Sequence, residues 1–156
     1  MCQSNLRQIG VAFKTYLDDN RDIMPPACAI GWDITDANDP HYAPPITNFL
    51  MPVLRGESKV FICSADTEKK YYLRTGNTSY YYNGKQQTGP IWTNGLGGTS
   101  IAASGPAKSG IKEKNIDVMS DFDLVHPGFT GTYRQRKGQK NYLYADWHVS
   151  DYKNQN

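Results

Sequence analysis

The stretch from Cys2 to about Asp19 places apolar side chains on one side of a helix. They recur every three or four residues, the spacing of neighbouring helical turns: Leu6, Ile9, Phe13, Tyr16 and Leu17. The helix cannot continue through Met24-Pro25-Pro26, because proline breaks the backbone hydrogen-bond ladder. A helix with a single apolar stripe has to bury that stripe against another element. Any fold of this chain therefore needs a surface that covers it.

Three later segments are typical of β-strands and can supply that surface. Residues 78–83 ("TSYYYN") are rich in β-branched and aromatic side chains. Residues 115–123 ("NIDVMSDFD") also predict a strand, and this segment ends in acidic residues. Residues 137–152 ("KGQKNYLYADWHVSDY") indicate a turn and two short strands. One long helix followed by late strands predicts an α+β fold, with the helix on one face of an antiparallel sheet.

The segments between the helix and these strands are less regular. Residues 46–54 ("ITNFLMPVL") predict a short helix that Pro52 weakens, and residues 59–63 ("KVFIC") predict a strand. Residues 25–45 and 86–110 predict long irregular loops. The "GLGG" at residues 95–98 follows no predicted strand and opens no predicted helix, so we expect a flexible loop there and not a dinucleotide-binding turn.

Length and charge limit the classes of function. A chain of 156 residues predicts one domain over residues 1–156. The 17 basic and 15 acidic residues leave a net charge of +2, which gives no overall indication of a nucleic-acid partner. The basic cluster "YRQRKGQK" at residues 133–140 is expected to be a solvated hairpin loop, with phosphate or an anionic polymer as the alternative ligand.

The best polar constellation lies at the ends of the late strands. Asp121 and Asp146 each close a predicted strand, with Asp123, His126 and His148 nearby in sequence. If the two strands are neighbours, Asp121, Asp123 and Asp146 could meet at one sheet edge and bind a hard cation such as calcium. The alternatives are that each aspartate caps a turn by accepting backbone hydrogen bonds, or that two of them form a catalytic carboxylate pair.

Motifs for nucleophilic or phosphate chemistry are missing, so we expect no enzyme. No G-x-S-x-G occurs, and "GPAKSG" at residues 105–110 lacks the Gly-Lys-Ser/Thr order of a phosphate-binding loop. The three cysteines, Cys2, Cys28 and Cys63, have no C-x-x-C spacing and do not indicate a zinc site. They allow three disulfide pairings, among which spacing does not choose.

Several segments, in the same order, resemble a family of type II secretion pseudopilins and type IV pilin-like proteins from Planctomycetes, Verrucomicrobia and Lentisphaerae. They cover residues 2–149 and are "CQSNLRQIGVAFKTYLDDN", "MPP", "VFICSAD", "TSYYYNG", "NIDVMSD" and "NYLYADWHV". Two substitutions depart from the family's H-x9-D-G-H-V ending, because Arg136 stands at the first His and Trp147 at the Gly. Ser64 stands where the family usually has Pro.

The resemblance implies that residues 1–19 are the remainder of a longer N-terminal helix. Its first half would be a transmembrane segment behind a basic leader, so that the chain starts after that half-helix. The implied function is a non-enzymatic structural subunit of a pseudopilus or pilin-like filament. Its partners would be other subunits, secretion machinery and the inner membrane, with the globular domain in the periplasm or outside the cell. Related proteins also bind calcium in a C-terminal loop, which implies Asp121 and Asp146 here.

This setting permits one disulfide, and we expect Cys63 to take part because it ends a predicted strand near the core. Two other classes of function stay open. One is an extracytoplasmic ligand-binding module, with glycans as ligands, in which Trp32, Trp92 and Trp147 supply stacking surfaces. The other is a small hydrolase that uses the Asp/His cluster.

Overall fold

The computed structural model describes residues 2–29, 42–66, 77–84, 86–88, 91–93, 95–121 and 140–151. One long helix, α1 (Cys2–Asp19), precedes all strands. The other helical elements are short: α2 (Thr47–Leu50), η1 (Ser58–Phe61), η2 (Ile101–Ala103), α4 (Gly105–Lys108) and η3 (Glu113–Asn115). The strands are β1 (Tyr80–Tyr82), β2 (Gln86–Thr88), β3 (Ile91–Thr93), β4 (Asp117–Asp121), β5 (Asn141–Tyr144) and β6 (Val149–Asp151).

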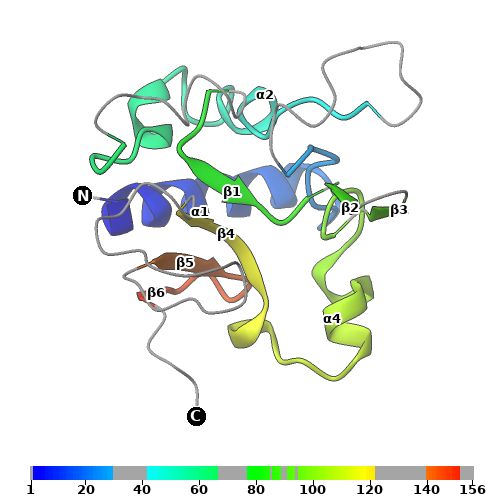
Figure 1. Ribbon diagram of the computed structural model, residues 1–156. Coiled ribbons are helices and arrows are strands. Elements are labelled where there is room, and N and C mark those ends of the chain that lie inside the picture. Colours follow the sequence, from blue (N-terminus) through cyan, green and yellow to red (C-terminus); the bar gives the residue numbers. More distant parts are fainter. Residues whose placement is uncertain are drawn as a thin grey trace.

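Four of these strands form one antiparallel sheet in the order β1-β4-β5-β6. Strands β2 and β3 pair separately as a two-stranded hairpin. In Figure 1, α1 crosses the middle of the molecule, with the α2 segment above it and strands β5 and β6 below it. It contacts β4, β5 and β6 as well as α2 and η1. The α+β fold with a helix on an antiparallel sheet is confirmed.

The apolar stripe of α1 is buried as its spacing predicts. Leu6, Ile9 and Phe13 are fully buried and Leu17 nearly so, while Tyr16 is partly buried beside the core. Phe13 is at the centre of this packing, because its ring stacks on Tyr82 at 5.7 Å and on Trp147 at 6.0 Å between centroids. The stripe therefore joins both the first and the last part of the sheet into one core.

A glycine allows α1 to approach the sheet closely. A Cβ atom on Gly10 would lie 3.0 Å from Leu143 Cδ1 of β5, which is tighter than ordinary van der Waals contact. Leu143 is itself fully buried. The absence of a side chain at Gly10 thus sets the distance between the helix and the middle of β5.

The predicted strand at residues 59–63 is wrong, because most of this segment forms the 3-10 helix η1. The side chain of Glu57 accepts a hydrogen bond from the backbone N–H of Lys59 and so favours a helical start. Val60 and Phe61 are buried. Their apolar side chains fill the core beside α1 and do not reflect strand pairing.

Other loop predictions are corrected in part. Residues 86–110 contain the β2–β3 hairpin, η2 and α4. The "GLGG" is anchored at its centre and is not the expected flexible loop, because Leu96 is fully buried and its N–H donates to Asn83 O over 2.8 Å. The short helix expected within residues 46–54 is present as α2. Most of the loop expected at residues 25–45 lies outside the described residues.

Candidate functional site

Asp121 is the last residue of β4, and its side chain is fully buried. The neighbouring strand β5 holds its carboxylate, because the backbone N–H and the side-chain Nδ2 of Asn141 both donate to Asp121 Oδ2, over 2.8 and 2.6 Å. Asn141 Oδ1 in turn accepts from Gln3 Nε2 of α1 over 2.9 Å. A continuous line of polar side chains therefore runs from the first turn of α1 to β4. Hydrogen bonds of this kind offset part of the cost of burying a carboxylate.

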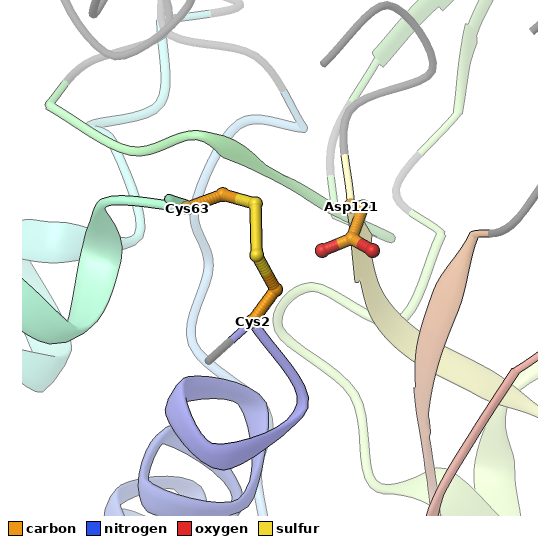
Figure 2. Close-up of side chains that lie close together, drawn as sticks. All are labelled: Cys2, Cys63 and Asp121. Carbon is orange, nitrogen blue, oxygen red and sulfur yellow. A yellow bond between two sulfur atoms is a disulfide. The ribbon is translucent and has the colours of Figure 1, made fainter. Parts of the chain in front are cut away.

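A disulfide between Cys2 and Cys63 lies beside Asp121, as Figure 2 shows. It joins the first turn of α1 to the segment after η1. The two cysteines are separated by 61 positions in the sequence, and their Cα atoms are 5.2 Å apart. The expectation of one bridge that includes Cys63 is confirmed, and the structure selects Cys2 as its partner. Cys28 is buried and takes no part in this disulfide.

The two sulfur atoms and a carboxylate oxygen of Asp121 all lie within 4.8 Å of one another. Cys63 and Asp121 are fully buried and Cys2 is 6% exposed. A disulfide sulfur lacks the thiolate charge that a metal ligand needs, so these three residues do not form a metal site in this structure. The group is instead a covalent cross-link with a buried negative charge beside it.

Tyr80, the partner of Asp121 across the β1–β4 ladder, is affected by the same charge. Burial raises the pKa of the Tyr80 hydroxyl well above its ordinary value, and the negative charge of Asp121 raises it further. Tyr80 therefore stays a neutral phenol next to the buried carboxylate.

Asp146 lies in the tight turn between β5 and β6, where its side chain is 38% exposed. Its Oδ1 accepts the backbone N–H of His148 over 3.2 Å and contacts His148 Nδ1. The His148 ring stacks on Tyr144 at 4.4 Å between centroids. Partial burial acts to raise the pKa of Asp146, but the hydrogen bonds and charge of His148 outweigh it and hold that pKa below its ordinary value.

Trp147 occupies a turn position whose backbone conformation favours Gly. Its backbone φ is +69°, in the left-handed region that Gly adopts most readily. In this chain the side chain offsets the strain by packing partly buried against Phe13. The turn between Asp146 and His148 is therefore fixed by its aspartate cap on one side and by the core on the other.

The structure does not bring Asp121 and Asp146 together, so the predicted shared calcium site at one sheet edge is wrong for this pair. Strands β4 and β5 are neighbours, as that hypothesis required, but they run antiparallel. Asp121 therefore lies beside Asn141 at the start of β5, and Asp146 follows Tyr144 at its end. Asp123 and His126 lie outside the described residues.

Sequence analysis missed the grouping of Asp121 with the disulfide, although signals for it exist. Cys2 precedes Leu6 and Ile9 at helical spacing, so it lies on the buried side of α1. Cys63 follows the buried pair Val60 and Phe61. No local sequence pattern gives the order of strands in the sheet. That order places the end of β4 beside these two cysteines.

Segments that carry the family resemblance contact one another across the fold. The first segment meets the third through the disulfide and through Asn5 Nδ2, which donates to Ile62 O over 2.8 Å. The remaining contacts link Ser79 Oγ to Asp66 Oδ2 (2.8 Å), Tyr82 Oη to Pro25 O (3.0 Å), Asn83 Nδ2 to Asp117 O (3.0 Å) and Asn141 to Asp121. Each quoted segment is thus tied to at least one other by a side chain.

Other sequence candidates add no chemistry within the described residues. The "GPAKSG" segment forms α4, and of the basic cluster only Lys140 is described. Trp32 lies outside the described residues, and of Trp92 only the backbone in β3 is described. An open pocket between α2, η1 and the start of β1 has uncharged walls: Thr47, Asn48, Met51, Ser58, Phe61 and Asn77.

None of the described helices has both the length and the apolar content that crossing a membrane requires. No protein-family model, curated protein or solved structure matches this chain.

Proposed function

We propose that this chain is the globular part of a structural subunit of a type II secretion pseudopilus or type IV pilin-like filament. The subunit is non-enzymatic and is anchored in the inner membrane by a segment that precedes α1 in the full protein. Its globular domain faces the periplasm or the outside of the cell. Its partners are other subunits of the filament and the secretion machinery.

The observation that carries this proposal is the contact between the resembling segments. Six short segments, each weak evidence alone, are connected by a disulfide and by side-chain hydrogen bonds such as Asp66–Ser79 and Asp121–Asn141. These contacts give the matched polar side chains structural roles within one fold, as is expected if the segments share an architecture with the family that they resemble.

The arrangement of α1 also suits this role. Its N-terminal end lies at the edge of the molecule in Figure 1, so a preceding helical segment can continue outward along the same axis. The disulfide at Cys2 fixes the first turn to the body of the domain. Such a helix would transmit force from a membrane or filament core to the globular part without bending at the junction.

The test is processing and assembly of the full protein in its native bacterium. The gene is tagged at its 3′ end, and the product is followed in the parent strain and in a strain that lacks prepilin peptidase. We expect a leader-bearing, heavier product in the second strain and its absence from the sheared surface fraction. A filament-forming pilin of the same bacterium is the control for the shearing step.

Processing that is unchanged without the peptidase, with release of a free periplasmic protein, would contradict the filament proposal. That outcome would favour the ligand-binding alternative, for which the uncharged pocket at Asn48 and Asn77 is the place to look for glycan binding. Hydrolase activity that disappears in Asp146→Ala would contradict the non-enzymatic part of the proposal.

A further inference from the structure

The Cys2–Cys63 disulfide is unusual in its surroundings, because a carboxylate is buried next to it. Both sulfurs lie within 4.8 Å of a carboxylate oxygen of Asp121, and no more than 6% of any of the three residues is exposed. The carboxylate is held in this position by two hydrogen bonds from Asn141 to Oδ2. Figure 2 shows the Asp121 side chain and the disulfide side by side, contributed by three different parts of the chain.

We propose that Asp121 is an electrostatic guard that slows attack on this disulfide by thiolates. The attacking species in thiol–disulfide exchange is an anion, and the sulfur that is expelled departs as an anion too. Both negative charges would develop close to a buried carboxylate, where screening by water and salt is weak. The proposal concerns the rate of exchange and does not depend on the filament function.

The direction of attack follows from burial. Cys2 is the more accessible of the two cysteines, so an external thiolate attacks the Cys2 sulfur, a new mixed disulfide forms and the Cys2–Cys63 bond breaks. The electron pair of that bond leaves on the Cys63 sulfur, which is fully buried near Asp121. A second external thiolate then attacks the mixed disulfide and releases Cys2. Overall, two external thiols become one external disulfide and the protein gains two thiols.

A guard of this kind has a kinetic signature that a merely structural residue does not produce. An intact disulfide is neutral, whereas the transition state of exchange carries the charge of the attacking thiolate, so the charge of Asp121 acts mainly on that transition state. Removal of the charge should therefore accelerate reduction and reoxidation together and leave their ratio almost unchanged. A loosened structure would instead accelerate reduction and slow reoxidation, because the two sulfurs would meet less often.

The experiment measures both rates in glutathione buffers at pH 7 for the wild type and for Asp121→Asn. This variant keeps an oxygen that can accept from Asn141 and removes the charge. We expect both rates to rise about tenfold or more, the size of effect that one nearby charge produces at low dielectric. Asp66→Asn is the matched control, because Asp66 is also buried and only three residues from Cys63 but is not in the cluster.

Unchanged rates in Asp121→Asn, or faster reduction with slower reoxidation, would overturn the proposal. Equal acceleration in Asp66→Asn would overturn it as well, because the effect would then not depend on the charge beside the sulfurs. If Asp121→Asn does not fold, the wild type is tested with two small thiols of opposite charge at low salt. The rate constant for reduction of the disulfide, expressed per thiolate, should be larger for the cationic cysteamine than for the anionic 2-mercaptoethanesulfonate. Equal rate constants would contradict the proposal.

Discussion

The two ends of the sheet contain the same residue type in opposite settings. At one end Asp121 is fully buried, receives two hydrogen bonds from Asn141 and lies beside the Cys2–Cys63 disulfide. At the other end the Asp146 side chain is 38% exposed and accepts a hydrogen bond from the backbone N–H of His148, two residues later in the chain. Asp121 closes β4 and Asp146 lies in the turn after β5, and one connects distant parts of the chain while the other shapes a single turn. Burial and sheet order, more than residue identity, decide which role an aspartate takes.

The largest expected effect comes from Phe13, whose ring packs between Tyr82 of β1 and Trp147 of the β5–β6 turn. Truncation by Phe13→Ala leaves a cavity between Tyr82 and Trp147 and is expected to lower the free energy of unfolding by about 3–5 kcal/mol. Urea denaturation followed by circular dichroism measures this loss. Val11→Ala on the exposed side of the same helix is the control, with an expected change within about 0.5 kcal/mol. Equal losses would contradict the packing of α1 on the sheet.

Removal of the disulfide tests how far the Asp121 end depends on its cross-link. The double variant Cys2→Ala/Cys63→Ala is expected to lose about 3–4 kcal/mol, because a closure over 61 residues constrains the unfolded chain strongly. Hydrogen exchange should increase most in the first turn of α1. Protection in the β5–β6 turn should change far less, and a uniform increase would show that the two ends are not separable.

A direct comparison of the ends uses the same substitution at each. Asp121→Ala leaves two donors of the partly buried Asn141 without their acceptor, so we expect a loss of about 2–3 kcal/mol. Asp146→Ala removes an exposed turn cap and should cost below about 1 kcal/mol. Thermal and chemical denaturation of the two variants side by side measures the difference. A larger loss for Asp146→Ala would reverse the comparison.

The pH dependence of the exposed end should be small and confined to acid. Because the folded-state pKa of Asp146 is lowered, its contribution is present above its unfolded-state pKa and is lost as pH falls through the folded-state value. Solvent and salt screen this exposed pair, so Asp146→Asn should differ from the wild type by about 0.5 kcal/mol or less at pH 7. Unfolding curves of the two proteins should converge in acid, at pH values below the ordinary carboxyl pKa of about 3.9, as the carboxylate is protonated. A gap that widens in acid would contradict the assigned hydrogen bonds.

The smallest expected effect is that of calcium. With Asp121 and Asp146 at opposite ends of β5, the pair cannot supply one cation with several oxygens. We therefore expect no calcium-dependent rise in the melting temperature of the wild type beyond that seen for Asp146→Ala. A rise that disappears only in Asp146→Ala would show that this turn binds the ion with ligands other than Asp121.

The parts of the fold that the sequence predicted well are those with local periodic patterns. The stripe Leu6, Ile9 and Phe13 identified α1 and its buried side, and aromatic or β-branched runs identified β1, β4, β5 and β6. The pattern at residues 59–63 misled, because Val60 and Phe61 are apolar for core packing and the Glu57 cap favours a 3-10 turn. The hairpin β2–β3 was missed because its residues alternate too weakly to stand out from a loop.

The candidate site was predicted only in its components. The predicted strand end at Asp121 and the disulfide that includes Cys63 are confirmed, whereas Asp146, predicted to end a strand, lies in the turn after β5. Their grouping depends on antiparallel pairing of β4 with β5 and on the position of α1 across them. These are relations between residues more than 60 positions apart in some cases, and no local spacing encodes them.

The contact of α1 with β4, β5 and β6 has a consequence for how the protein folds as it is made. The ribosome releases α1 before the strands that cover its apolar stripe, and β5 and β6 are the last of the described elements to emerge. Until those strands emerge, the part of the stripe that they cover lacks its partner, and exposed apolar surface of this kind favours aggregation of a nascent chain. Cys63 emerges long before β5, so oxidation of Cys2 can fix the helix to the first half of the chain early. The sheet then closes on a helix that is already held in place.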